Sequence, residues 1–217
     1  MKLRLRRAFR TTVILLTLFG LGCAGHKESP PPAVKPVPPR VLAAEKVVDR
    51  LHVAMAEIMK SGPELGYEGR EALLMQVSLE VYDFPAMASL SYGPTWSDLT
   101  VEQQAMWIEI YTQFHVSSEA EVRNVYRGQT YRMLGYREVP DGHVLIETQL
   151  DYPGRSVDFF TNYLLRLSDG QWRIIDIFSP PSVSEVAMRR AEYRTVLEKS
   201  GYSGLVDDME KRMKGRK

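Results

Sequence analysis

The sequence predicts an α+β domain in which a four-stranded, twisted antiparallel sheet is packed by helices. Apolar residues recur at helical spacing from residue 41 to about residue 126, and the period changes to two across residues 129–179. Helical spacing returns after residue 182, and the strands are joined by short connections. Such connections favour an antiparallel meander, and helices segregated from the sheet are typical of the α+β class.

The composition excludes several classes of protein. Of the 217 residues, 44% are hydrophobic and 25% are charged, which excludes wholesale disorder and a polytopic membrane protein. The single cysteine excludes an internal disulfide framework and a cysteine-rich zinc site. A net charge of +1 gives no reason to expect nucleic acid as a partner.

Residues 1–22 have the order of segments that is typical of a secretory signal peptide. Residues 1–10 carry five basic side chains and no acid, residues 11–21 are apolar, and small residues follow. The apolar run is short for a membrane span, so an uncleaved anchor is the lesser alternative. Removing this +5 from the net charge of +1 leaves −4 for the rest of the chain. We therefore expect a mildly acidic protein located in the periplasm.

Cys23 stands where a lipoprotein signal places its acylated cysteine. Gly22 fits this pattern, but Gly20 occupies a position where leucine is expected, so ordinary cleavage near Gly22 or Ala24 is the competing interpretation. If Cys23 is lipidated, the absence of Asp after it favours the outer membrane.

Residues 23–40 are predicted to be a linker. Six prolines in residues 29–40 remove backbone donors and fix φ, so neither helix nor sheet is expected there. A polyproline spacer of this length would reach about 35 Å and could hold a domain away from a bilayer. A generic disordered leader is the alternative. The folded domain is expected over residues 41–217.

The predicted helices before the sheet cover residues 41–61, 70–82, 83–90 and 100–126. Gly62-Pro63 ends the first helix, and Asp83 can cap the third. Thr100 and Gln103 form a capping box that opens the fourth.

The predicted strands cover residues 129–138, 143–152, 156–168 and 171–179. Turn signals at residues 140–142, 153–154 and 169–170 separate them. After the sheet, Ser182 and Glu185 form a second capping box, and Gly201 fits the end of that helix. A last amphipathic helix is expected over residues 203–213.

A search for catalytic and metal-binding motifs is negative. The sequence contains no G-x-S-x-G, H-E-x-x-H, P-loop or dinucleotide-binding pattern. Its four histidines are scattered, without a second ligand at metal spacing. Asp176 lies inside an apolar strand, and a buried carboxylate needs a partner. We expect Arg189 or Arg190 to form a structural ion pair with Asp176, with Glu192 in the same group; a catalytic base is the alternative.

Large apolar side chains are the positive signal in the composition. Ten Met, eleven Tyr, seven Phe and three Trp are spread over the predicted helices and strands. Most of them build a core, but a sheet covered by helices can also enclose a dry cavity. Flexible Met side chains suit an irregular apolar ligand.

An ordered set of short motifs covers about two thirds of the chain. It includes Asp83-Phe84, Tyr92-Gly93, Asp169-Gly-Gln-Trp172, Ser184–Tyr193 and Gly201–Leu205. In these motifs the chain resembles, from about residue 73 onward, the MlaC or toluene-tolerance family of periplasmic phospholipid-binding proteins that serve ABC transport systems. Within that family it is similar in particular to the hopanoid-associated, HpnM-like branch.

The resemblance implies a lipid carrier and not an enzyme. It implies a nuclear-transport-factor-like core that holds phospholipid or hopanoid-like acyl chains in a hydrophobic pocket between sheet and helices. The implied partners are a lipid ligand, an MCE-domain ABC transporter complex at the inner membrane and an outer-membrane lipoprotein complex. No cofactor is implied. A tether at Cys23 would depart from the freely soluble carriers of the family.

The residues expected to contact lipid are large apolar side chains on both helices and strands. They are Met87, Leu90, Trp107, Tyr111, Phe114, Phe159, Tyr163, Leu165 and Ile177. Each is equally a candidate for an ordinary core residue. Two other functions stay open: a non-lipid adaptor or assembly lipoprotein of the cell envelope, and an enzyme on a nuclear-transport-factor-like scaffold. The enzyme would need a pocket carboxylate or histidine with a strongly shifted pKa.

Overall fold

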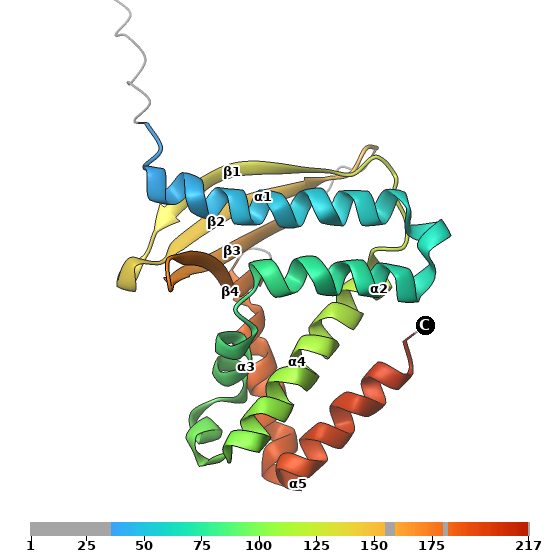
Figure 1. Cartoon of the computed structure of the whole chain (residues 1–217), viewed down its shortest axis with the longest axis vertical. Coiled ribbons are helices and arrows are strands. Elements are labelled where there is room, and N and C mark those ends of the chain that lie inside the picture. Colours follow the sequence, from blue (N-terminus) through green and yellow to red (C-terminus); the bar gives the residue numbers. More distant parts are fainter. Residues whose placement is uncertain (1–35, 155–158, 180–181, 217) are drawn as a thin grey trace, which may run out of the picture. The chain divides into compact units, whose positions relative to one another are not determined.

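The structure is a computed structural model that describes residues 36–154, 159–179 and 182–216 (Figure 1). The predicted signal peptide, Cys23 and most of the predicted linker lie outside these residues. The folded domain corresponds to a compact unit, Val37–Lys217. None of its described helices is both long and apolar enough to cross a membrane.

The helices are α1 (Pro39–Lys60), α2 (Gly62–Val81), α3 (Phe84–Tyr92), α4 (Val101–Val122) and α5 (Glu185–Lys214), with short 3-10 turns η1 (Pro94–Asp98) and η2 (Pro140–Gly142). The strands are β1 (Thr130–Glu138), β2 (Val144–Asp151), β3 (Phe159–Ser168), β4 (Gln171–Ser179) and β5 (Val183–Ser184). The predicted α+β class and its order of helices, sheet and helix are confirmed.

The sheet has five strands among the described residues, not the predicted four. They form an antiparallel meander in the order β1-β2-β3-β4-β5. The additional strand, β5, is only two residues long and pairs with the end of β4. Two residues show no period, and their strand character comes entirely from the partner strand, so the sequence pattern could not reveal it.

Helix α1 begins inside the predicted linker. Six prolines argued against any helix over residues 29–40, but Pro39 is the first helical residue. Proline is favoured at that position because the first N–H of a helix has no intrahelical partner and the ring presets a helical φ. The prediction was therefore wrong for Pro39 and Arg40.

Local capping interactions start two of the helices where predicted. The Asp83 side chain accepts a hydrogen bond from the Ala86 backbone N–H, and Thr100 with Gln103 forms the complete capping box. The cap of α5 differs from the prediction, because Ser184 accepts from the Ala187 N–H and Ser182 is not the cap. Residues 183 and 184 form β5, so α5 begins two residues later than predicted.

Helix α5 is divided into two arms at Gly201, as its predicted stop implied. Gly201 has φ +65° and ψ −169°, which no helical residue adopts. The second arm turns back toward the rest of the domain (Figure 1). Arg212 on this arm forms an ion pair with Glu192 on the first arm. The buried Leu205 and Met209 anchor the second arm to the core.

The sheet positions the helices in two groups. Helix α1 lies across one face of the sheet and contacts β1, β2 and β4 (Figure 1). Helix α4 packs against α2, α3 and α5 in a bundle below the sheet in the same view. The core is continuous through both regions.

Candidate functional site

One face of the sheet is buried beneath α1 and forms the apolar interior of the domain. Two rows of cross-strand neighbours occupy its centre: Ile146, Tyr163 and Ile177, and Val144, Leu165 and Ile174. All six side chains are buried. Alternation along β2 and β3, together with a bulge at Ile175 in β4, places these residues on one side of the pleat, so the face is a continuous apolar surface.

The contact between α1 and this face includes a small polar cluster. The His52 Nε2 lies 3.2 Å from the Tyr163 hydroxyl, and its ring stacks on Tyr131 with centroids 4.1 Å apart. The Tyr131 hydroxyl donates to the Met55 sulfur at 3.6 Å. Burial is the main reason that the pKa of His52 is lowered to about 4, and the positive charge of Arg123 lowers it by a smaller amount. His52 is therefore neutral at neutral pH, and these contacts between helix and sheet are weak ones.

The apolar face becomes exposed toward one end of the sheet. Tyr131, Leu150 and Phe159 are neighbours across β1, β2 and β3. Tyr131 and Leu150 are half-buried, and Phe159 is 38% exposed. The Phe159 ring packs edge-on against Tyr152 at 5.1 Å. We call this end, defined by Tyr131, Leu150, Tyr152 and Phe159, the aromatic rim.

The structure divides the nine residues predicted to contact lipid into two groups. Phe159, Tyr163, Leu165 and Ile177 lie on the sheet, and Met87, Leu90, Trp107, Tyr111 and Phe114 lie on α3 and α4. Leu90 is 42% exposed, whereas the other four helical residues are buried. Five cavities among the described residues have volumes of about 270 to 720 Å³, and none of the nine predicted residues lines any of these five.

The buried helical residues make specific core contacts. The Trp107 indole N–H donates to the Ala88 carbonyl at 3.3 Å, and its ring packs edge-on against Tyr193. The Phe114 ring lies 4.8 Å from the Arg189 guanidinium and 4.4 Å from that of Arg216. These residues therefore serve the packing of the helices.

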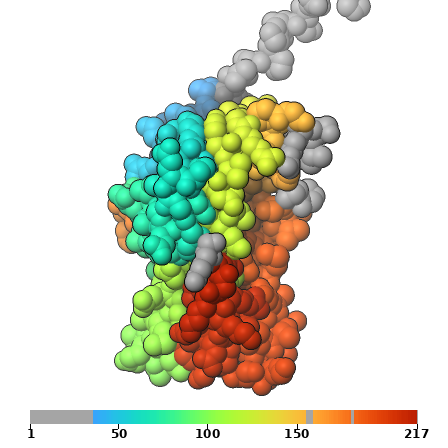
Figure 2. All heavy atoms as spheres, turned by 90° about the vertical axis from the view of Figure 1, so that its right-hand side faces the viewer, coloured from blue at the N-terminus to red at the C-terminus, as the bar shows by residue number. Residues whose placement is uncertain are grey.

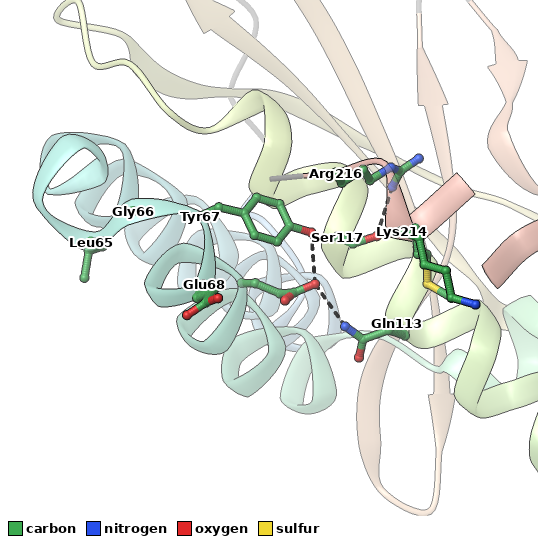
Figure 3. Close-up of a pocket in the computed structure, with 10 residues that line it drawn as sticks. Leu65, Gly66, Tyr67, Glu68, Gln113, Ser117, Lys214 and Arg216 are labelled. Atoms are coloured by element: carbon green, nitrogen blue, oxygen red, sulfur yellow. Dashed lines mark hydrogen bonds between the residues drawn. The ribbon is translucent and has the colours of Figure 1, made fainter. Parts of the chain in front are cut away.

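A polar cleft of about 680 Å³ lies between α2, α4 and the end of α5 (Figure 3). The Tyr67 hydroxyl and the Gln113 amide both donate to Glu71 Oε1, at 3.1 and 2.9 Å. Partial burial and then the bond to Glu71 raise the pKa of Tyr67 to about 12. Arg216 donates to the Ser117 hydroxyl at 2.9 Å.

The bonds of Glu71 join α2 to α4, and the bond of Arg216 joins the end of the α5 arm to α4. The residues of the cleft therefore hold the C-terminal arm of α5 in place. Figure 2 shows the same arm (dark red) beside α4 (green) and below α2 (teal).

Asp176 does not form the predicted ion pair. Its carboxylate accepts from the backbone N–H groups of Ile177 and Val186, at 2.8 and 3.1 Å, and from the Ser184 hydroxyl at 2.5 Å. Burial raises the pKa of Asp176, and these three bonds act against that shift. The pairing of β5 with β4 brings the Val186 N–H, in the first turn of α5, to the carboxylate, so Asp176 anchors the start of that helix.

The arginines expected beside Asp176 have other partners. Arg189 pairs with Glu192 at 3.3 Å and lies 3.8 Å from Glu185. The Arg190 Nε donates to the Leu90 carbonyl at 2.7 Å. Both arginines lie about one turn beyond Val186, whose backbone N–H donates to the Asp176 carboxylate.

Sequence reasoning did not identify the pairing of His115 on α4 with Glu185 on α5. The His115 Nδ1 lies 3.6 Å from Glu185 Oε1, and Tyr82 packs edge-on against the imidazole. Burial alone would lower the pKa of His115, but the hydrogen bond and charge of Glu185 raise it overall. No cluster of three His, Cys, Asp or Glu side chains that could hold a metal ion occurs in the described part of the chain.

Comparisons with known proteins give a family and a fold. The family model described as "MlaC protein" matches residues 49–211. A solved structure of a phospholipid-binding protein from Ralstonia solanacearum, in complex with a phospholipid, matches with a TM-score of 0.68. It is 19% identical, and the match covers 80% of this chain and 96% of that chain. A search of curated proteins found no match.

Proposed function

Because this chain belongs to the MlaC family, whose model matches residues 49–211, we propose that it is a periplasmic lipid-binding carrier and not an enzyme. Its cargo would be a phospholipid or a hopanoid-like lipid. It would pass that lipid between an outer-membrane lipoprotein complex and an MCE-domain ABC transporter at the inner membrane, with Cys23 as a lipid anchor. The observation that carries the proposal is the likeness in fold to a protein whose structure holds a phospholipid.

The apolar sheet face beneath α1 is the proposed place for the acyl chains. It is continuous across three strands, and the aromatic rim is one end at which it reaches solvent. Each CH₂ group removed from water contributes about 0.8 kcal/mol, so an acyl chain can bind tightly without a specific polar contact. A carrier of this kind needs no catalytic group.

Lipid binding at this face requires α1 to move away from the sheet, because the interior is packed. The buried polar contacts that would break are His52 with Tyr163 and Tyr131 with Met55. The exposed ion pair between Arg40 on α1 and Glu138 on β1 would break with them. Neutral hydrogen bonds contribute only about 0.5–1.5 kcal/mol each. Burial of a few methylene groups offsets that loss, and the lipid would replace the apolar contacts of α1 with its own.

Native mass spectrometry of the full chain, produced in bacterial cells and released from membranes, tests the proposal. We expect a bound mass that lipid extraction identifies as a phospholipid or hopanoid-like lipid. Phe159→Arg places a charge at the aromatic rim and should remove most of this mass. Leu167→Arg is the matched control, because Leu167 lies on the same strand and face at its other end and is 52% exposed.

Two results would contradict the proposal. One is a wild-type protein that carries no lipid when made in cells that contain the transport system. The other is a Phe159→Arg variant that keeps as much lipid as Leu167→Arg, which would place the acyl chains elsewhere in the fold.

A further inference from the structure

A second groove, away from the sheet, lies between the first arm of α5 and the turn that follows α3. Its volume is about 720 Å³, within the range of about 300–1,000 Å³ that is typical of small-ligand pockets. Small residues line it from one face of α5, and larger apolar residues close its sides. The main lining residues are Ala187, Ala191, Leu197, Tyr92 and Tyr202.

The walls of this α5 groove are held in place by contacts outside it. The Tyr92 ring packs edge-on against Trp96 and Trp107, at 5.9 and 5.7 Å. The Tyr202 hydroxyl donates to the Gln103 carbonyl on α4 at 3.0 Å. The positive φ of Gly201 turns the chain so that Tyr202 reaches this position. The groove is therefore preformed in the folded domain.

Two arginines and the Glu198 carboxylate line the α5 groove, so one net positive charge remains there. The Arg190 Nε donates a hydrogen bond to the Leu90 carbonyl. The aliphatic part of the Arg190 side chain passes Gly93, and a Cβ atom added to Gly93 would lie 3.4 Å from the Arg190 Cγ. The two terminal nitrogens of Arg190 have no partner among the described residues. Arg194, one turn further along, lies 3.8 Å from Glu198, and both of these side chains are more than two thirds exposed. One anchored guanidinium with a free end is suited to a carboxylate or phosphate.

We propose that the α5 groove binds a single-chain anionic amphiphile, with its chain along the small residues of α5 and its anionic group on Arg190. This site goes beyond the proposed carrier function, because it is separate from the sheet face beneath α1. A fatty acid and a lysophospholipid share the required chemistry, one apolar chain with one anionic group. The volume suits a ligand of that size, and the charge of the arginines is complementary to it.

Calorimetric titration of the full chain tests the proposal with dodecanoate and with lysophosphatidic acid, each below its micelle concentration. We expect at least one of them to bind, and which one binds identifies the source of the anion. Dodecyltrimethylammonium should bind at least about tenfold more weakly, and Arg190→Gln should weaken binding of the anion by about tenfold or more. Arg127→Gln is the control, because Arg127 is exposed and does not line the groove.

The proposal is overturned if neither anion binds, if the cationic amphiphile binds as well as the anions, or if Arg190→Gln binds like the wild type. Ala191→Leu gives a second variant that fills the groove while keeping a good helix former. It should abolish binding in the titration and leave the co-purified lipid of the carrier site unchanged. If Ala191→Leu lost both the titrated binding and the co-purified lipid, the groove would be the carrier site itself. That result would overturn the proposal of a second site.

Failure of the carrier proposal is distinguishable from failure of this one. Absence of co-purified lipid in every variant, with dodecanoate still bound in an Arg190-dependent manner, contradicts the carrier function and supports the groove.

Discussion

The pKa values of two buried histidines are shifted in opposite directions. His52 has only neutral neighbours within bonding distance, the Tyr163 hydroxyl and the Tyr131 ring, so burial lowers its pKa to about 4. His115 is equally buried, but the Glu185 carboxylate overcomes the effect of burial and raises its pKa. Burial sets the direction of the pKa shift of His52, whereas a charged partner in contact reverses that direction for His115.

His52 should make the domain less stable as the pH falls from about 6.5 to about 4. Over that range the unfolded chain binds a proton that the folded state excludes, so the free energy of unfolding decreases by up to about 3 kcal/mol. His52→Phe should remove this part of the pH dependence, although it leaves the Tyr163 hydroxyl without its partner at every pH. Urea unfolding at pH 5 and 7.5 measures the difference, and an equally steep pH dependence in the variant would contradict it.

The Asp176 carboxylate should matter for stability through the backbone groups that it accepts from. Asp176→Ala leaves the Ile177 and Val186 N–H groups and the Ser184 hydroxyl without their acceptor. A buried donor left without a partner costs about 1–3 kcal/mol, so we expect a loss of about 3 kcal/mol or more in chemical denaturation. Asp207→Ala, on the exposed side of α5, should change stability by less than about 0.5 kcal/mol. Comparable effects of the two substitutions would refute this role.

At the scale of elements, the bend in α5 depends on a backbone conformation that glycine alone adopts readily. Gly201 has φ +65° and ψ −169°, a region that is strained for any residue with a Cβ atom. No atom lies within 4 Å of the Cβ that alanine would add. Strain, and not a clash, is therefore the reason for glycine at this position.

Gly201→Ala should lower the free energy of unfolding by about 1–3 kcal/mol. Gly215→Ala serves as the control, since Gly215 has φ −83° and its added Cβ would contact only the Arg212 carbonyl at 4.0 Å. Thermal unfolding of the two variants separates the effects. If Gly201→Ala is as stable as Gly215→Ala, the bend does not depend on the glycine conformation.

For the whole molecule, the proposed lipid site lies between α1 and the sheet, so lipid and α1 compete for the same apolar face. Any ligand that binds only the folded state raises the free energy of unfolding by RT ln(1 + [L]/Kd). The gain is about 2.7 kcal/mol at a free lipid concentration of 100 times Kd. The measured Kd already includes the free energy of exchanging the α1 contacts for lipid contacts.

Protein stripped of lipid should therefore unfold at a lower temperature than protein purified with lipid. Adding the extracted lipid back should restore the original unfolding temperature. A scan of both samples by circular dichroism makes the comparison. Identical unfolding temperatures, with bound lipid confirmed by mass spectrometry, would show that the lipid does not stabilise the folded domain.

Much of the secondary structure was predictable because it depends on interactions within a few residues of one another. The caps at Asp83 and Thr100 reach only three residues along the chain. The same holds for the turns at residues 140–142 and 169–170. The errors occurred where a local rule had an exception or met a tertiary contact, as at Pro39 and in the two-residue β5.

Period and turn chemistry are local properties, so the amino-acid sequence was enough to predict the α+β class and the antiparallel meander. Which apolar residues lie together depends on how the elements pack, and the packing separated the nine predicted residues into a sheet group and a helix group. It also gave Asp176 backbone donors in place of an arginine and brought Arg190 to the end of α3. Such pairings join residues far apart in the chain, and their geometry is set by how whole elements pack.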